Sequence, residues 1–194
     1  MDRREALKRT ALLMGGAVSA PAIMGVLKGC TARPEIDWKP VFLTEDQASV
    51  VTQVSEIIIP RTDTPGAKDA GVPTFIDQML KEVYSEEDQK WFIDGLTSFN
   101  EAAREGYDDV FADLDDEDQT SYVKEVHDDA VETANTTQPE PRRPFILMMK
   151  ELTMLGFFTS EAGATKVLQY DPVPGAYKGC IPLSEAGNGK TWAT

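Results

Sequence analysis

The stretch that most constrains this fold is residues 145–158, FILMMKELTMLGFF, in which Lys150 and Glu151 are the only charged residues. A helix that is apolar on nearly every side has to be covered by other elements. This run is also too short to span a membrane as a helix. We therefore predict that residues 145–158 form the central buried helix of the domain.

Apolar residues recur at helical spacing in five further segments, and no segment shows the alternation of a strand. Thr44 and Gln47 form a capping box at the start of the first helix. Ser85 and either Asp115 or Asp116 are expected to cap two later helices. The additional helices are expected at residues 44–59, 73–83, 85–106, 116–133 and 160–170. The fold class predicted is an all-α orthogonal helical bundle with long Pro/Gly-rich loops and an irregular C-terminal tail.

Three local details follow from the same pattern. Val83 and Trp91 belong to the apolar faces of their helices, so we expect both side chains in the core. Residues 64–67, with the sequence TPGA, have the composition of a turn in which Gly66 tolerates a positive φ. Gly106 is expected to stop the helix that starts at Ser85.

Residues 1–29 have the features of a bacterial export signal. Arg3 and Arg4, followed by an apolar residue and Lys8, resemble the twin-arginine signal. Residues 10–27 are apolar, small and uncharged, as in the hydrophobic part of a signal peptide. The twin-arginine route carries folded proteins, so we expect the chain to fold before export to the bacterial periplasm.

The end of this leader, Leu27-Lys28-Gly29-Cys30, resembles a bacterial lipobox. It predicts a lipid on Cys30 and association with the membrane through that anchor. An uncleaved anchor, or cleavage at a small residue such as Ala32, stays open as an alternative. Residues 30–43 include two prolines and are expected to form a tether, and residues 44–194 a single helical subunit domain.

Charge and cysteine content exclude several classes of function. The chain has 33 acidic and 19 basic residues and a net charge of −14. A surface this acidic repels phosphate backbones, so no nucleic acid is expected as a partner. The two cysteines are too few for a disulfide scaffold or a four-thiolate metal site.

Candidate catalytic and metal-binding residues are few. His127 is the only histidine, which excludes the paired Glu-x-x-His motifs of a di-iron bundle, and we expect it to be solvated or to cap its helix. The acidic run at residues 113–118 lacks the glycine and glutamate of an EF-hand loop, which favours an acidic helix start. The chain has no haem-attachment motif and no dinucleotide fingerprint. We predict no catalytic, cofactor or metal site in this chain.

Two segments are distinctive beyond their physical pattern. Residues 56–77 have the sequence EIIIPRTDTPGAKDAGVPTFID, and residues 155–183 have the sequence LGFFTSEAGATKVLQYDPVPGAYKGCIPL. Together they resemble the gluconate 2-dehydrogenase subunit 3 family. The resemblance spans residues 43–183, although residues 85–140 carry no motif of their own.

This resemblance implies a non-catalytic small subunit of a periplasmic flavin-dependent sugar or sugar-acid dehydrogenase. The large partner of such a subunit is similar to the glucose-methanol-choline oxidoreductases and holds FAD, and a cytochrome c subunit often accepts the electrons. The small subunit assists the folding, stability and twin-arginine export of the large one. A free-standing periplasmic lipoprotein that binds a sugar or a cell-envelope partner is the alternative function.

The loops of the two distinctive segments are the expected contact surfaces for the partner, because Pro and Gly restrict their backbones and Tyr and Arg are enriched at interface hot spots. The alternative, that these loops only cover the bundle's own core, stays open. Cys180 is expected to bond to another chain or to be buried, with a bridge to Cys30 as a third possibility. The candidate interface residues are Arg61, Asp63, Pro65, Tyr170, Asp171, Pro172, Tyr177 and Cys180.

Overall fold

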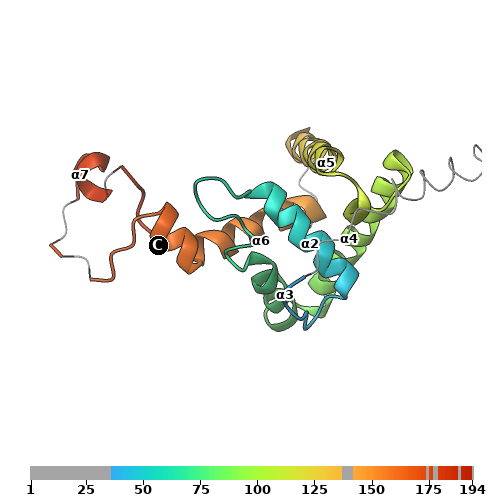
Figure 1. The fold of residues 1–194 in the computed structure, drawn as a ribbon, viewed down its shortest axis with the longest axis horizontal. Helices are drawn as coiled ribbons and strands as arrows, with labels where there is room; N and C mark the ends of the chain where they lie inside the picture. The colour runs from blue at the N-terminus through green and yellow to red at the C-terminus, as the bar shows by residue number, and fades with distance from the viewer. Residues whose placement is uncertain (1–35, 137–141, 174, 177–178, 188, 194) are drawn as a thin grey trace, which may run out of the picture. The chain divides into compact units, whose positions relative to one another are not determined.

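The computed structural model describes residues 36–136, 142–173, 175–176, 179–187 and 189–193 (Figure 1). Arg3, Arg4, Cys30 and Tyr177 lie outside the described residues. The helices are α2 (Glu45–Ile58), α3 (Val72–Glu82), α4 (Glu86–Tyr107), the 3₁₀ turn η1 (Phe111–Asp113), α5 (Asp116–Thr136), α6 (Phe145–Thr159), the π-helical turn η2 (Gly163–Val167) and α7 (Leu183–Gly187). The all-α prediction is confirmed.

Local side-chain chemistry sets the start of α2 and α3. The hydroxyl of Thr44 accepts a hydrogen bond from the backbone N–H of Gln47, and the Gln47 side chain accepts one from the N–H of Thr44. The predicted capping box is therefore confirmed. Pro73 occupies the first turn of α3, where its missing N–H costs no helical hydrogen bond.

The ends of α4 and α5 depend on aspartates. Ser85 caps α4 as predicted, but the helix continues through Gly106. It stops at Asp108, which takes the left-handed conformation (φ 60°) that glycine more often supplies. Asp115 caps α5 by accepting the N–H groups of Glu117 and Asp118.

Helix α6 is the centre of the bundle, since it packs against α2, α3, α4 and α5. Close approach depends on two glycines. A Cβ on Gly95 of α4 would lie 2.7 Å from Cβ of Phe145, and one on Gly156 would lie 2.7 Å from the ring of Phe75. The central position of this helix is confirmed, although Leu155 remains half-exposed.

Two expected core residues lie outside the core. Val83 is 65% exposed at the end of α3. Trp91 is 37% exposed, and its indole N–H donates to the carbonyl of Arg143 at 2.9 Å. The helical period placed both side chains at the edge of an apolar face, where the neighbouring helices do not cover them.

A buried carboxylate joins the segment before α2 to the bundle. Asp77 of α3 is 1% exposed, and its two oxygens accept the backbone N–H groups of Val41, Phe42 and Leu43 at 2.6, 3.1 and 2.8 Å. Trp38 also packs against the core. Residues at the end of the expected tether are thus fixed to the bundle.

The C-terminal region has more order than predicted. The helix after Ser160 ends at η2, and the chain later returns to it through a parallel bridge between Gln169 and Trp192. Gln169 donates to the carbonyl of Thr191 at 2.7 Å and accepts from Ala193 at 2.8 Å. No helix in the described part of the chain has the length and apolarity needed to cross a membrane.

Candidate functional site

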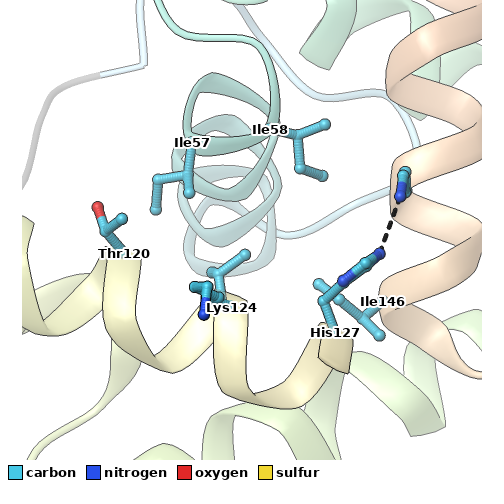
Figure 2. A pocket seen from close by; sticks show the side chains of 8 residues that line it. Ile57, Ile58, Thr120, Lys124, His127 and Ile146 are labelled. Carbon is cyan, nitrogen blue, oxygen red and sulfur yellow. Dashed lines mark hydrogen bonds between the residues drawn. The ribbon is translucent and has the colours of Figure 1, made fainter. Parts of the chain in front are cut away.

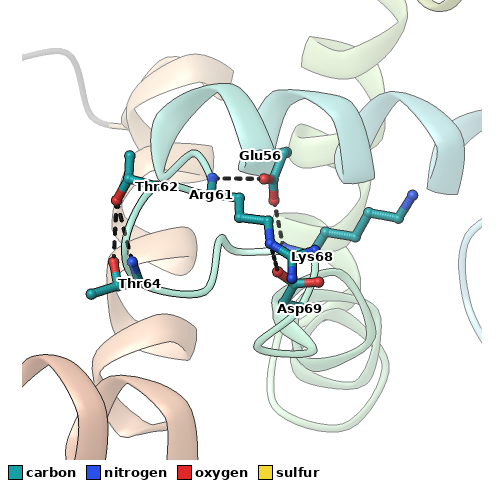
Figure 3. A network of polar contacts seen from close by, with 6 residues as sticks. All are labelled: Glu56, Arg61, Thr62, Thr64, Lys68 and Asp69. Carbon is teal, nitrogen blue, oxygen red and sulfur yellow. Dashed lines mark hydrogen bonds and ion pairs between the residues drawn. The ribbon is translucent and has the colours of Figure 1, made fainter.

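The first distinctive segment forms a loop that the carboxylate of Glu56 holds in place (Figure 3). Glu56, near the end of α2, accepts the backbone N–H of Arg61 at 2.9 Å and that of Lys68 at 2.8 Å. Ala67 is buried and donates to the carbonyl of Ile59 at 2.8 Å. These bonds fix the loop's backbone from within the chain, so a partner would meet a preformed surface.

The turn in this loop differs from the prediction. Its hydrogen bonds run from Ala70 to the carbonyl of Gly66 and from Val72 to that of Ala67, so the turn follows residues 64–67. The positive φ, 74°, belongs to Gly71. A Cβ on Gly66 would overlap one oxygen of Glu56 and lie 2.6 Å from the other. Gly66 therefore allows the carboxylate to approach the loop.

The three candidate residues of this loop differ in exposure. Arg61 has a side chain that is 73% exposed, with Nε 3.4 Å from a carboxylate oxygen of Asp69. Asp63 is also exposed, whereas Pro65 is half-buried. Arg61 and Asp63 are therefore accessible to a partner, and Pro65 partly covers the bundle itself.

The candidates of the second segment are exposed wherever the structure describes them. Tyr170 is 55% exposed. Asp171 accepts the N–H of Val173 at 3.1 Å in a local turn, and Pro172 is exposed beside it. No hydrogen bond or ion pair between described residues joins these three to the candidates of the first loop.

Cys180 is an exposed free thiol. The expectation that it is sheltered within this chain is therefore wrong. The short helix α7 begins just after this residue and leaves it uncovered, because the described residues around it are exposed as well. A bond to another chain stays a prediction, and Cys30 lies outside the described residues.

Large apolar side chains accompany these candidates in the C-terminal region. Val173 is 81% exposed, Leu183 52%, Trp192 44% and Ile181 38%. Single exposed apolar residues are ordinary on a surface, whereas a contiguous patch of them is typical of a binding surface. We call these four residues and Tyr170 the apolar tail.

An apolar hollow with a cationic rim lies between α2, α5 and α6 (Figure 2). It has a volume of about 270 Å³ and is lined by Ile57, Ile58, Thr120, Val123, Lys124, His127, Ile146 and Lys150. His127 does not cap its helix and is only partly solvated. Its side chain is 27% exposed, with Nδ1 3.3 Å from Asp128 and Nε2 2.9 Å from Nζ of Lys150. Sequence analysis missed this contact because it joins two helices.

The ionisable groups in and near the hollow form no metal site. Within the described ranges, no three or more His, Cys, Asp or Glu side chains lie close enough to hold a metal ion. The Asp128 carboxyl has its pKa lowered by hydrogen bonds from His127 and Lys124. The acidic run at residues 113–118 contributes the cap of α5 through Asp115.

Comparison with protein families decides the assignment. The family model of gluconate 2-dehydrogenase subunit 3 matches residues 45–175. The chain belongs to the gluconate 2-dehydrogenase subunit 3 family. No curated protein and no solved structure matches it.

The candidate interface residues of this subunit fall into two groups, those inside the residues matched by the family model and those beyond them. Arg61, Asp63 and Pro65, together with Tyr170, Asp171 and Pro172, lie within the matched residues. Tyr177 and Cys180 lie beyond them, as does α7. The family assignment thus covers the helical bundle and η2, and the remainder of the apolar tail is described by this structure alone.

Proposed function

We propose that this chain is a non-catalytic small subunit that binds and stabilises a flavin-dependent sugar or sugar-acid dehydrogenase. The catalytic partner is a flavoprotein similar to the glucose-methanol-choline oxidoreductases, and it holds the FAD. A cytochrome c subunit receives the electrons. The chain escorts the flavoprotein through the twin-arginine route, and a lipid on Cys30 anchors the complex at the periplasmic face of the membrane.

The observation that carries this proposal is the apolar tail on a well-packed bundle. Burial of apolar surface contributes about 25 cal/mol per Å², so exposure of five large apolar side chains favours association. The bundle has its own core, with Phe92, Phe111 and Met149 fully buried. The tail is therefore not needed to complete that core, which supports a role for it in contact with another chain.

A partner would also protect the groups that the isolated chain leaves in solvent. Arg61 is an exposed cation in a preformed loop, a suitable contact for a carboxylate of the partner. Cys180 is exposed and can bond to a cysteine of the partner in the oxidising periplasm. Both features support a complex of at least two chains.

The tail is tested by purifying the tagged chain from its own host and identifying what accompanies it. We expect a stoichiometric flavoprotein of the glucose-methanol-choline class, with flavin absorbance in the same fraction. Val173→Ser combined with Leu183→Ser should release it. Val83→Ser is the control, since the exposed fraction of Val83 (65%) lies between those of Val173 and Leu183 and the residue lies at the end of α3. Purification of the chain without any flavoprotein would favour the free-standing lipoprotein instead.

The export role is tested separately by Arg3→Lys combined with Arg4→Lys. We expect both the chain and its flavoprotein to accumulate in the cytoplasm, because the twin-arginine signal is the only one the pair shares under this proposal. Periplasmic dehydrogenase activity of the mutant strain is the measurement. Normal activity there would show that the flavoprotein is exported independently.

A further inference from the structure

The hollow between α2, α5 and α6 combines apolar walls with positive charge. Ile57 and Ile58 of α2, Val123 of α5 and Ile146 of α6 supply the walls. Lys124 and Lys150 supply the charge, and no Asp or Glu is among the lining residues. In a chain of net charge −14, such a grouping of lysines around an apolar surface is unusual.

The two lysines are held differently. Nζ of Lys124 lies 3.3 Å from a carboxylate oxygen of Asp128, one turn further along α5. Nζ of Lys150 donates to Nε2 of His127 at 2.9 Å, an arrangement that assigns the imidazole proton to Nδ1, beside Asp128. Among the described residues, no carboxylate lies within ion-pair distance of Lys150 Nζ.

Charge at the mouth of the hollow is therefore incompletely balanced. The carboxylate of Asp128 lies within ion-pair distance of Lys124, whereas the ammonium of Lys150 contacts Nε2 of His127. His127 positions the ammonium of Lys150 without neutralising it. An incoming carboxylate would supply the missing negative charge through a charge-assisted hydrogen bond.

The walls decide what else the ligand carries. Because they are made of isoleucine and valine side chains, a hydrocarbon group would bury apolar surface there favourably. Hydroxyl groups would lose their water without finding hydrogen-bond partners, which is costly. The volume of about 270 Å³ leaves room for a ligand of several non-hydrogen atoms.

We propose that this hollow binds a small aliphatic monocarboxylate, with its hydrocarbon on the isoleucine and valine walls and its carboxylate on Lys150. Hexanoate, with about eight non-hydrogen atoms, is of suitable size. Polyhydroxylated acids such as gluconate are excluded by the walls. The site belongs to this chain alone and does not depend on a dehydrogenase partner.

The test is an NMR titration of the purified ¹⁵N-labelled chain with three compounds. Hexanoate carries both features of the proposed ligand, hexanol lacks the charge, and gluconate has the same carbon chain with hydroxyl groups. Hexanoate should shift the amides of Ile57, Val123, His127 and Ile146, with hexanol binding about tenfold more weakly. Gluconate should leave them unchanged. Equal shifts with gluconate, or shifts elsewhere in the molecule, would overturn the proposal.

A matched pair of variants isolates Lys150. Lys150→Met keeps the aliphatic stem and removes the charge, and it should weaken hexanoate about tenfold while leaving hexanol unchanged. Lys90→Met removes an exposed lysine on α4 that pairs with Asp94, and it should have no effect. Equal affinity of both variants for hexanoate would contradict the proposal.

Discussion

The loop of residues 61–71 and the C-terminal region after η2 belong to the two segments by which the family is recognisable, yet the structure holds them in different ways. Glu56 fixes the first loop through two backbone N–H groups, and Ala67 within the loop is buried. The second region is closed by a bridge at its base and leaves its apolar side chains in solvent. A preformed surface and an uncovered one therefore occur in the same subunit.

The largest effect is expected from Asp77 of α3, compared with Asp171 of the C-terminal region. Asp77→Ala removes the buried acceptor of three N–H groups and should destabilise the fold by about 3–5 kcal/mol. Asp171→Ala removes one exposed acceptor and should cost less than about 0.5 kcal/mol. Urea unfolding followed by circular dichroism measures both. Similar losses would mean that the tail contributes to folding as much as the bundle does.

The next largest difference in stability between the two regions is expected from substitutions of two glycines. Gly66→Ala places a methyl group against the Glu56 carboxylate and 2.7 Å from the backbone nitrogen of Arg61, so we expect a loss of about 2–3 kcal/mol. Gly175→Ala meets nothing within 4 Å and should be neutral. Melting temperatures of the two variants provide the comparison. An unchanged melting temperature of Gly66→Ala would show that the Glu56 side chain can shift away from the loop without loss of stability.

The bundle should also weaken at alkaline pH. Burial, followed by the charge of Glu125, raises the pKa of Tyr122 to about 12, while its hydroxyl donates to the carbonyl of Phe99. The unfolded chain loses this proton near pH 10, before the folded chain does. Stability should therefore be complete below about pH 10 and fall as the pH rises to about 12. Denaturant titrations across this range measure how the free energy of unfolding depends on pH. Tyr122→Phe should reduce that dependence.

Arg61→Ala should change the stability of the fold only slightly. The ion pair with Asp69 is exposed, so the loss should be about 0–1 kcal/mol. If Arg61 contacts the flavoprotein, the same variant should reduce the amount that co-purifies. Loss of the complex with unchanged unfolding would identify Arg61 as an interface residue. Loss of stability with a retained complex would instead mean that the loop mainly covers the bundle.

Features encoded within a few residues were predictable from the sequence. The capping box of Thr44 and Gln47, the Ser85 cap and the apolar run of α6 depend on short-range patterns, and the structure confirms each of them. Trp91 has the right helical period but faces Arg143, because the periodicity of one helix does not show where its neighbours end.

Features that depend on distant contacts were not predictable. Lys150 and His127 are on different helices, and neither residue's local sequence indicates the other. Gly66 was correctly chosen as special but for the wrong reason, since its role depends on the side chain of Glu56. Asp77 carries no sign in the sequence that three N–H groups from before α2 converge on it.

The bridge between Gln169 and Trp192 closes the region between these two residues into a loop. Two backbone hydrogen bonds of about 1 kcal/mol each close it. Closing a loop of this length costs about 3 kcal/mol of chain entropy. The closed form is thus nearly balanced against the open one, and a tag at the C-terminus would change the geometry of the apolar tail without replacing any of its residues.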